Sequence, residues 1–431
     1  MVNKKQFWTL ILVATLSTGL AAWHLMTRNK LPVLLQNFVV MVIGSSDSLL
    51  RCTESVLAYR NTTLNKKASA FNRCQNNSSV PYLGQSSKVG TTSLAYSDIL
   101  RTIKLTNISV EKESDCRYHR FIVYSCDSSR FCGGLGDRQR GMVSAFLLAI
   151  VTSRVFVINF DKPCSIENAL IPHLYNWSIC RNFVNTFDKN KSKLFDFVDG
   201  SPFFDGIQHF NFELEWSWQV IFMKINTNLI TRLQRRRDFK DQHKWLLTKP
   251  MQTIFSLILH TLFKPKQYIL NYMHRFDIDH VLGKTLVCSH IRTGGNPTIP
   301  NDDIFTRQPN KSVVFEFLKR FADPNKYVLY LASDSDSIRK EFYKKFQNSI
   351  KTNVSVVHID RLGPLQRFKT QACEGLKFAV IEQLILSTCD TLLVTKSGFG
   401  INAAYLRGTS NNLYVLYRTS EDVKTVNLNK L

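Results

Sequence analysis

The sequence predicts an α/β protein that is built on doubly wound parallel sheets. Strand-like and helix-like segments alternate regularly along about the last 150 residues of the 431-residue chain, and the strands there are apolar almost throughout. A second observation is a strand, glycine loop, helix and strand within residues 121–160, which together form a βαβ unit. Without the N-terminal segments, roughly 330–350 residues are left for globular structure, which suggests two domains.

The C-terminal alternation is assigned from apolar runs and the polar breaks between them. The expected strands are residues 284–291, 326–332, 354–359, 391–395 and 413–417, and the expected helices are residues 311–321, 335–346, 374–387 and 399–407. Asp334 or Ser335 is expected to cap the second of these helices. Near-continuous apolar strands that alternate with helices are typical of a parallel sheet that is covered on both faces.

The βαβ unit further upstream has strands at 121–125 and 154–160, a helix at 138–151 and the turn CGGLG at 132–136. The turn lacks the G-x-G-x-x-G spacing of nicotinamide and flavin proteins, so a site of that kind is excluded. Two interpretations remain for its glycines: backbone that a ligand approaches closely, or a tight turn that needs positive φ.

The middle of the chain, residues 161–281, is aromatic-rich and has no clear alternation. Helices are expected to dominate from residue 214 to residue 273. The basic run 232–238 is interpreted as a solvated helix face in preference to a phosphate or lipid site.

An uncharged run at residues 7–26 follows Lys4 and Lys5 and is long enough for a helix to span a bilayer core of roughly 30 Å. We interpret it as an uncleaved signal anchor with a cytoplasmic tail at 1–6, which gives a type II membrane protein. A cleaved signal peptide is the alternative. Residues 27–115 are expected to form a stem.

Cysteines and sequons indicate a secretory compartment. The ten cysteines lack zinc-site spacing and are expected to form disulfides, with local bridges among those at 116–180, although Cys288 and Cys389 fit buried free thiols equally well. The N-x-S/T sequons are expected glycosylation sites: Asn61, Asn76, Asn77, Asn107, Asn176, Asn190, Asn310 and Asn353. In a lumenal protein, the net charge of +23 favours an anionic membrane surface or an anionic substrate such as a nucleotide sugar over nucleic acid.

Ligands bind at the carboxyl ends of strands in such sheets, and that rule selects the loops at 290–296, 333–336 and 396–400. Their small polar residues suit a diphosphate, and Arg292 supplies a charge-assisted fork for its oxygens. Asp334 and Asp336 formally match a metal-binding D-x-D pair. Their place between a strand and a helix suits an N-cap or a nucleotide contact at least as well.

Four segments resemble motifs of the fucosyltransferase superfamily, which includes protein O-fucosyltransferases, α1,2- and α1,6-fucosyltransferases and bacterial nodulation fucosyltransferases. Residues 133–160 look like the family's opening glycine loop and helix, and residues 290–294 (HIRTG) resemble its H-x-R-R-G-D motif. Residues 331–335 (LASDS) resemble its A-T/S-D-S segment, and residues 397–400 (SGFG) lie where it has a serine-containing phosphate loop. The segments occur in the family's order and cover roughly residues 120–417.

The resemblance implies a GT-B-like fold, two Rossmann-like domains that face a cleft, with residues 116–280 on the acceptor side and residues 281–431 holding the nucleotide sugar. It implies transfer of fucose from GDP-fucose to a glycan or glycoprotein acceptor, with inversion and without a metal ion or other cofactor. Together with the anchor, it places a lumenal catalytic domain at the Golgi or ER membrane. No nucleic-acid partner is expected.

The catalytic residues that we expect are Arg292, which stabilises the departing diphosphate, and Asp137. Asp137 has two interpretations, a contact with the sugar or acceptor and a cap of the helix that follows it. His290 is expected to shape its loop or contact the donor, and Asp302 and Asp303 are weaker candidates for a base. The donor-binding residues that the resemblance implies are Gly134, Gly136, Arg138, His290, Arg292, Gly294, Gly295, Asn296, Ser333, Asp334, Ser335, Ser397, Gly398 and Phe399.

Two departures from the family pattern bear on activity. Thr293 replaces the second arginine of the motif, and Gly295 and Asn296 displace its final acidic residue. Two other functions therefore stay open, a catalytically inactive carbohydrate-binding relative and another lumenal transferase. A sulfotransferase is such a transferase, but the GGLGDRQRG loop is a poor match to its phosphate-binding loop. The acceptor and the linkage are not encoded in these motifs.

Overall fold

The computed structural model describes residues 92–127, 132–239, 241–294, 309–352, 357–359, 369–417 and 420–431. All of them belong to one compact unit, Pro81–Leu431. No helix in these ranges is long and apolar enough to cross a membrane. The expected anchor at 7–26 lies outside the described residues, as does the stem as far as residue 91.

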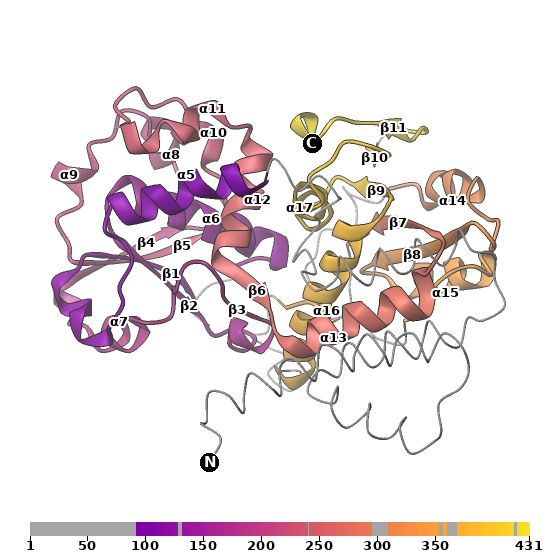
Figure 1. Cartoon of the computed structure of the whole chain (residues 1–431), viewed down its shortest axis with the longest axis horizontal. Helices are drawn as coiled ribbons and strands as arrows, with labels where there is room; N and C mark the ends of the chain where they lie inside the picture. Colours follow the sequence, from indigo (N-terminus) through magenta and orange to yellow (C-terminus); the bar gives the residue numbers. More distant parts are fainter. Residues whose placement is uncertain are drawn as a thin grey trace, which may run out of the picture. The chain divides into compact units, whose positions relative to one another are not determined.

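The first sheet has the strands β1 (Phe121–Cys126), β2 (Val155–Phe160), β4 (Ser192–Phe197) and β5 (Val220–Ile225), all parallel, in the order β2-β1-β5-β4 (Figure 1). Helix α6 (Leu135–Val151) connects β1 to β2, which confirms the expected βαβ unit. Fourteen residues of α6 are buried, so this helix packs into the core along most of its surface. We call the elements on this sheet the N-lobe.

Strand β5 interrupts the region 214–273 in which we expected mainly helices. Its sequence VIFMKI is apolar at nearly every position because β5 pairs with a strand on either side in the middle of the sheet. A short run of that kind cannot be told from a buried helix by periodicity. The other elements of the middle region are α7 (Arg181–Thr186), α8 (Phe203–Gly206), α9 (Phe212–Glu215), α10 (Ile230–Leu233), α11 (Trp245–Thr248), α12 (Met251–Leu262), α13 (Gln267–Phe276) and the small pair β3 (Leu170–Pro172) and β6 (Phe263–Pro265).

The second sheet has the order β11-β10-β9-β7-β8 and defines the C-lobe. Four of its strands run parallel, β7 (Thr285–Ile291), β8 (Tyr327–Ser333), β9 (Thr391–Thr395) and β10 (Leu413–Leu416), whereas β11 (Lys424–Thr425) is antiparallel. The helices α14 (Lys311–Lys319), α15 (Asp336–Lys345), α16 (Lys369–Thr388) and α17 (Gly398–Arg407) alternate with these strands. The α/β prediction is confirmed.

One expected C-lobe strand, at residues 354–359, is wrong over its described part, because residues 357–359 are not in a strand. The residues that pair with β8 lie earlier in the chain than 354–359. The Leu329 amide donates to the Asn348 carbonyl at 3.0 Å, and the Ile350 amide donates to the Leu329 carbonyl at 2.9 Å. The turn after α15 therefore supplies the edge of the sheet.

Helix α5 (Thr92–Leu105) corrects the end of the stem, which we expected at residue 115. Ile99, Ile103 and Ile108 are buried in the main hydrophobic core. The Thr102 hydroxyl donates to the Gln242 carbonyl at 2.7 Å, so this segment is tied to the N-lobe by polar contacts as well. Apolar spacing at i and i+4 on one helix face explains why residues 92–108 pack into the body.

Four disulfides connect the described cysteines, and none of the described cysteines is free. The Cys116–Cys180 and Cys126–Cys132 bridges both form within the cluster at 116–180, as expected, but only the second is local, since their sequence separations are 64 and 6 residues. Cys288 and Cys389 form a bridge between β7 and the end of α16, so the free-thiol alternative is wrong. Cys164–Cys373 joins the N-lobe to the C-lobe.

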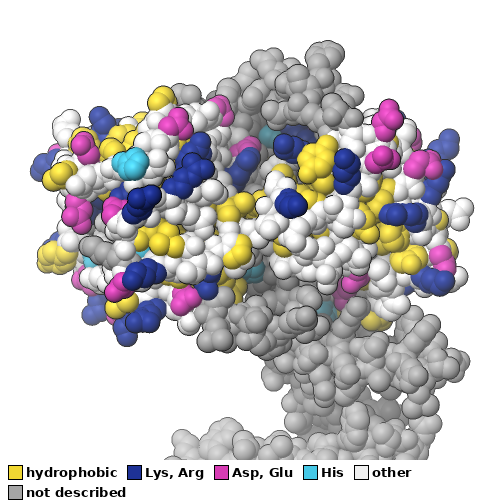
Figure 2. All heavy atoms as spheres, turned by 90° about the horizontal axis from the view of Figure 1, so that it is seen from above, with side chains coloured by type: hydrophobic (Ala, Val, Ile, Leu, Met, Phe, Trp, Pro, Cys, Tyr) yellow, Lys and Arg dark blue, Asp and Glu magenta, His cyan; other side chains and the backbone are white. Residues whose placement is uncertain are grey.

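The described sequon asparagines all lie at the surface. Asn107, Asn176, Asn190 and Asn310 are exposed, which glycosylation requires, whereas Asn61, Asn76, Asn77 and Asn353 lie outside the described residues. Figure 2 shows basic and acidic side chains interspersed over one face of the molecule. The positive charge is not gathered into one patch on that face.

Candidate active site

Three loops of the C-lobe meet at the carboxyl edge of its sheet, because β7 lies between β8 and β9. The Arg292 amide, which follows β7, donates to Thr395 Oγ1 at the end of β9 at 3.1 Å. On the other side, Arg292 forms an ion pair with Asp334, which follows β8. The structure thus brings together the loops that the strand-end rule selected.

The loop after β7 already holds an anionic group. The Asp334 carboxylate accepts hydrogen bonds from the Thr293 amide at 2.8 Å, the Thr293 hydroxyl at 3.0 Å and the Gly294 amide at 2.8 Å, in addition to the Arg292 guanidinium. Gly294 has a φ of +77°, which turns its amide toward the carboxylate. Successive amides that converge in this way form an anion-binding nest.

His290 is a buried side chain at the end of β7. Its ring lies 5.4 Å from the Phe399 ring, and a Cβ on Gly400 would come within 2.6 Å of its Nδ1. Burial lowers the pKa of His290 to about 4, despite the nearby Asp334 carboxylate, so the ring is neutral near neutral pH. These contacts agree with a role in shaping the loop.

Buried polar groups support the end of β8. Arg339 donates from Nε to the Ser333 carbonyl at 2.8 Å and from a terminal nitrogen to Glu382 at 2.7 Å. Burial raises the pKa of Glu382, although Arg339 favours its charged form. The Ser335 hydroxyl accepts from the Ile338 amide at 3.4 Å, so Ser335 caps α15, the role expected for it or Asp334.

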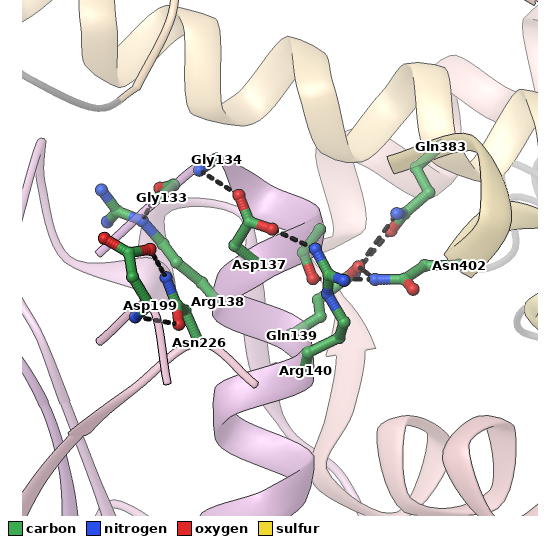
Figure 3. Close-up of polar contacts among 11 residues, drawn as sticks. Gly133, Gly134, Asp137, Arg138, Gln139, Arg140, Asp199, Asn226, Gln383 and Asn402 are labelled. Carbon is green, nitrogen blue, oxygen red and sulfur yellow. Dashed lines mark hydrogen bonds and ion pairs between the residues drawn. The ribbon is translucent and has the colours of Figure 1, made fainter. Parts of the chain in front are cut away.

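The glycine loop of the N-lobe leads directly into α6. Gly133 has a φ of +82°, and the Asp137 carboxylate accepts from the Gly134 amide at 3.2 Å (Figure 3). Asp137 also pairs with Arg140, one turn further along the helix. Asp137 therefore stabilises the start of α6, and its carboxylate, with a side chain 37% exposed, is still accessible.

Arg138 lies in a different environment from the donor contact that we expected. Its guanidinium is buried above the Phe160 ring and donates to the carbonyls of Gly133, Lys162 and Ile359. Because the Ile359 carbonyl belongs to the C-lobe, Arg138 holds the two lobes together. Its hydrogen bond to the Gly133 carbonyl fixes the position of the glycine loop.

The N-terminal ends of α6 and α17 meet across the lobes. A Cβ on Gly136 would lie 2.6 Å from the Phe399 nitrogen, so only glycine fits there. The Asn402 amide group donates to the Gly136 carbonyl at 2.9 Å, and Gln139 and Gln383 exchange hydrogen bonds of 2.5 and 2.9 Å (Figure 3). Two helix N-termini, each with a partial positive charge, thus lie side by side.

Arg140 is a candidate residue that the sequence analysis missed. Its guanidinium reaches from α6 to the start of α17, where a Cβ on Gly398 would be 2.6 Å from one of its terminal nitrogens. Among the described residues, its Nε has no hydrogen-bond partner. The i, i+3 spacing from Asp137 placed both side chains on one helix face, but nothing in the sequence placed that face against α17.

The other expected residues divide into two groups. Ser397 occupies the N-cap position of α17, and Gly398 and Phe399 form its first turn, next to Gly136. Gly295, Asn296, Asp302 and Asp303 lie outside the described residues. Within the part of the chain that the structure describes, no group of three or more His, Cys, Asp or Glu side chains is arranged to hold a metal ion.

Comparisons with known proteins gave structural matches only, since no family model and no curated protein sequence matches this chain. A structure of a mutant of Arabidopsis thaliana FUT1 in complex with GDP is 16% identical, with a TM-score of 0.53 over 80% of this chain and 83% of that one. NodZ α-1,6-fucosyltransferase with GDP matches with 14% identity and a TM-score of 0.46 over 72% and 98% of the two chains. POFUT1 with GDP-fucose matches with 10% identity and a TM-score of 0.38 over 70% and 99%.

At such identities the comparison concerns the fold. The chain shares the fold of Arabidopsis thaliana FUT1 over most of both chains. The motif resemblance implied a fold of this kind, and the structural likeness agrees with that part of the expectation.

Proposed function

We propose that this protein is a fucosyltransferase that transfers fucose from GDP-fucose to a glycan or glycoprotein acceptor, with inversion at the sugar carbon. The observation that carries the proposal is the anion-binding loop after β7. There the Arg292 side chain and the amides of Thr293 and Gly294 already surround a carboxylate. The two amides are engaged by Asp334 and hold the loop with its H-x-R-x-G pattern in place, so that the Arg292 guanidinium, which has several N–H donors, suits a diphosphate.

Positive charge from both lobes supports donor binding. Arg292 comes from the C-lobe, and Arg140 comes from the N-lobe at the start of α17. The paired N-termini of α6 and α17 add partial positive charge at the same place. We assign the diphosphate to this region, with the two arginines supplying the charge that a metal ion supplies in other transferases.

In the proposed reaction, the bond between the fucose C1 and the β-phosphate oxygen breaks, and the acceptor hydroxyl forms its bond to C1 from the opposite face. Arg292 stabilises the negative charge on the departing phosphate, for which one well-placed donor contributes about 3–4 kcal/mol. The acceptor proton passes to a carboxylate. We assign this role to Asp137, whose accessible carboxylate lies at the start of α6 beside Arg140.

We also propose a lumenal location at the Golgi or ER membrane, with a single N-terminal helix as the anchor. The uncharged run at 7–26, the disulfides and the exposed sequon asparagines support this placement. The acceptor is expected to bind on the N-lobe side of the site.

The first experiment is a donor-binding assay on the purified full-length protein. Thermal stabilisation or calorimetry would compare GDP-fucose with GDP-mannose, UDP-sugars and a sulfate donor. Selective binding of GDP-fucose is expected, with a loss of about tenfold or more in Arg292→Ala and in Arg140→Gln, since each removes a charged hydrogen-bond donor. Arg101→Ala is the matched control, because Arg101 is an exposed residue of α5.

Each outcome of this assay decides between functions. Binding of the sulfate donor alone would favour a sulfotransferase, and failure to bind any nucleotide would favour an inactive carbohydrate-binding protein. An Arg292→Ala variant that binds GDP-fucose as tightly as the unaltered protein would contradict the assignment of the donor loop.

A further inference from the structure

A second site lies at the opposite end of the N-lobe sheet. A cavity of about 390 Å³ opens at the amino ends of β1 and β2, where it is lined by Arg120 and Arg154. The glycine loop that leads into α6 follows the carboxyl end of β1. A six-residue strand spans about 20 Å, so this cavity is separate from the candidate active site.

Arg154 places a charged group in the wall of this cavity. Its side chain is almost fully buried, and its terminal nitrogens donate to the Trp218 carbonyl at 2.7 Å and the Trp216 carbonyl at 2.5 Å. Among the described residues it has no carboxylate within ion-pair distance. Burial, together with the charge of Arg120, lowers the pKa of Arg154 to about 10, so it keeps its charge at neutral pH. A buried cation that is held only by carbonyls favours an anion beside it.

The charges that line the cavity do not cancel. Arg120 is exposed at the edge, near enough to Arg154 to repel it, and has no ion pair with any described residue. Arg236 is neutralised by Asp238, with which it forms a two-point ion pair. Glu213 is the other carboxylate of the lining. Among the described residues of the lining, three arginines against two carboxylates leave one positive charge, which suits a ligand with a single negative charge.

Aromatic and hydroxyl-bearing residues form another part of the lining. Phe210, Phe212 and Phe239 present apolar surface, and Thr152 and Ser153 bring hydroxyl groups. A mixture of ring faces and hydrogen-bonding groups suits a polyhydroxylated ring, and the volume lies in the range of small-ligand sites. A bare inorganic ion would leave most of this space unfilled.

We propose that this cavity binds an acidic sugar, a monosaccharide unit with one carboxylate or sulfate group, through Arg120 and Arg154. The proposal is independent of the donor assigned above, because the cavity shares no residue with the loops of the candidate active site. In a protein that acts on glycans, such a site would hold an acidic unit of the acceptor, or of a second glycan, away from the reacting group.

The test is calorimetric titration of the full-length protein in 150 mM salt, with GDP present so that the candidate donor site is occupied. The ligands are glucuronic acid and N-acetylneuraminic acid as sugar carboxylates, glucose 6-sulfate as a sugar sulfate, inorganic sulfate, and glucose as the neutral sugar. Arg120→Ala is the variant, since Arg120 is exposed and its loss leaves the core intact. Arg237→Ala is the control, because Arg237 is exposed, adjoins Arg236 and does not line the cavity.

The expected result is binding of at least one acidic sugar, which Arg120→Ala weakens about tenfold and Arg237→Ala changes less than twofold. The carboxylate and sulfate ligands show which anion is preferred. Three results would overturn the proposal: no heat with any acidic sugar, glucose binding as well as glucuronic acid, or the same weakening in both variants. The last of these would indicate a general effect of charge.

Discussion

The substitution Asp334→Asn tests the architecture of the loop after β7, the proposed donor loop. Among the described residues, Asp334 accepts contacts from Arg292, from the Thr293 amide and hydroxyl, and from the Gly294 amide. Asparagine keeps one acceptor oxygen and places an NH₂ group where the second oxygen was. Since each carboxylate oxygen accepts two of the contacts, two are lost. A hydrogen bond to a charged group contributes at least about 1.5 kcal/mol, so the loss is about 3 kcal/mol.

This value is not reduced much by solvent, because the Asp334 side chain is only 8% exposed. We expect the thermal midpoint of unfolding to fall by several degrees and the affinity for GDP to fall about tenfold or more, because the amides of Thr293 and Gly294 lose their orientation. Scanning calorimetry and isothermal titration with GDP measure the two effects. Asp336→Asn is the matched control, since Asp336 is exposed and lies two residues further along.

The reasoning is refuted if Asp334→Asn unfolds at the same temperature as Asp336→Asn. A second informative result is a stable Asp334→Asn protein with tighter GDP binding. In that case the carboxylate competes with the diphosphate for the loop, and its role as a positioning residue is wrong.

Two further predictions concern the lobe contact and acid stability. Gly136→Ala places a Cβ against backbone atoms of α17 and is expected to cost about 1–3 kcal/mol and weaken GDP binding, whereas Gly206→Ala, in open space, is the control for both measurements. Burial lowers the pKa of both His260 and His290 to about 4 from 6.5, so the stability that their neutral forms support is complete above pH 6.5 and is lost as the pH falls toward 4. At pH 5 the loss is about 2 kcal/mol for each histidine, and His260→Gln should remove half of the pH dependence; equal unfolding midpoints at pH 7.5 and pH 5 would contradict this.

The alternation in the C-lobe could be predicted from the sequence because the strands β7, β8, β9 and β10 are buried at nearly every position, and β7, β8 and β9 each end in a small polar loop. The strand-end rule then placed Arg292, Asp334 and Ser397 on one edge of the sheet before any contact was known. The rule did not predict which of these side chains contact one another at that edge. Nothing in the sequence indicated that Asp334 would occupy the loop after β7.

The N-lobe has features that the sequence pattern did not predict. Strand β5 is the partner of β1 in the centre of the sheet, yet its apolar run of six residues has the same pattern as a buried helix turn. Arg138 and Arg140 are two positions apart in the sequence and have opposite environments, one buried among carbonyls and one at the start of α17. This difference in environment depends on which face of α6 meets the C-lobe. Tertiary packing around Gly136 decides that face.

The same packing bears on the proposal that the site functions with threonine at position 293, where the fucosyltransferase motif has a second arginine. The Thr293 hydroxyl and amide both bind Asp334, so this residue holds the carboxylate that orients the loop. In the proposed donor site, Arg140 of the other lobe, next to Gly398, supplies the positive charge that the motif's second arginine would bring. Arg140 can do so only while the N-termini of α6 and α17 stay in contact, because it belongs to α6 and the proposed diphosphate loop belongs to the C-lobe. The proposed donor site therefore depends on the contact between the two lobes.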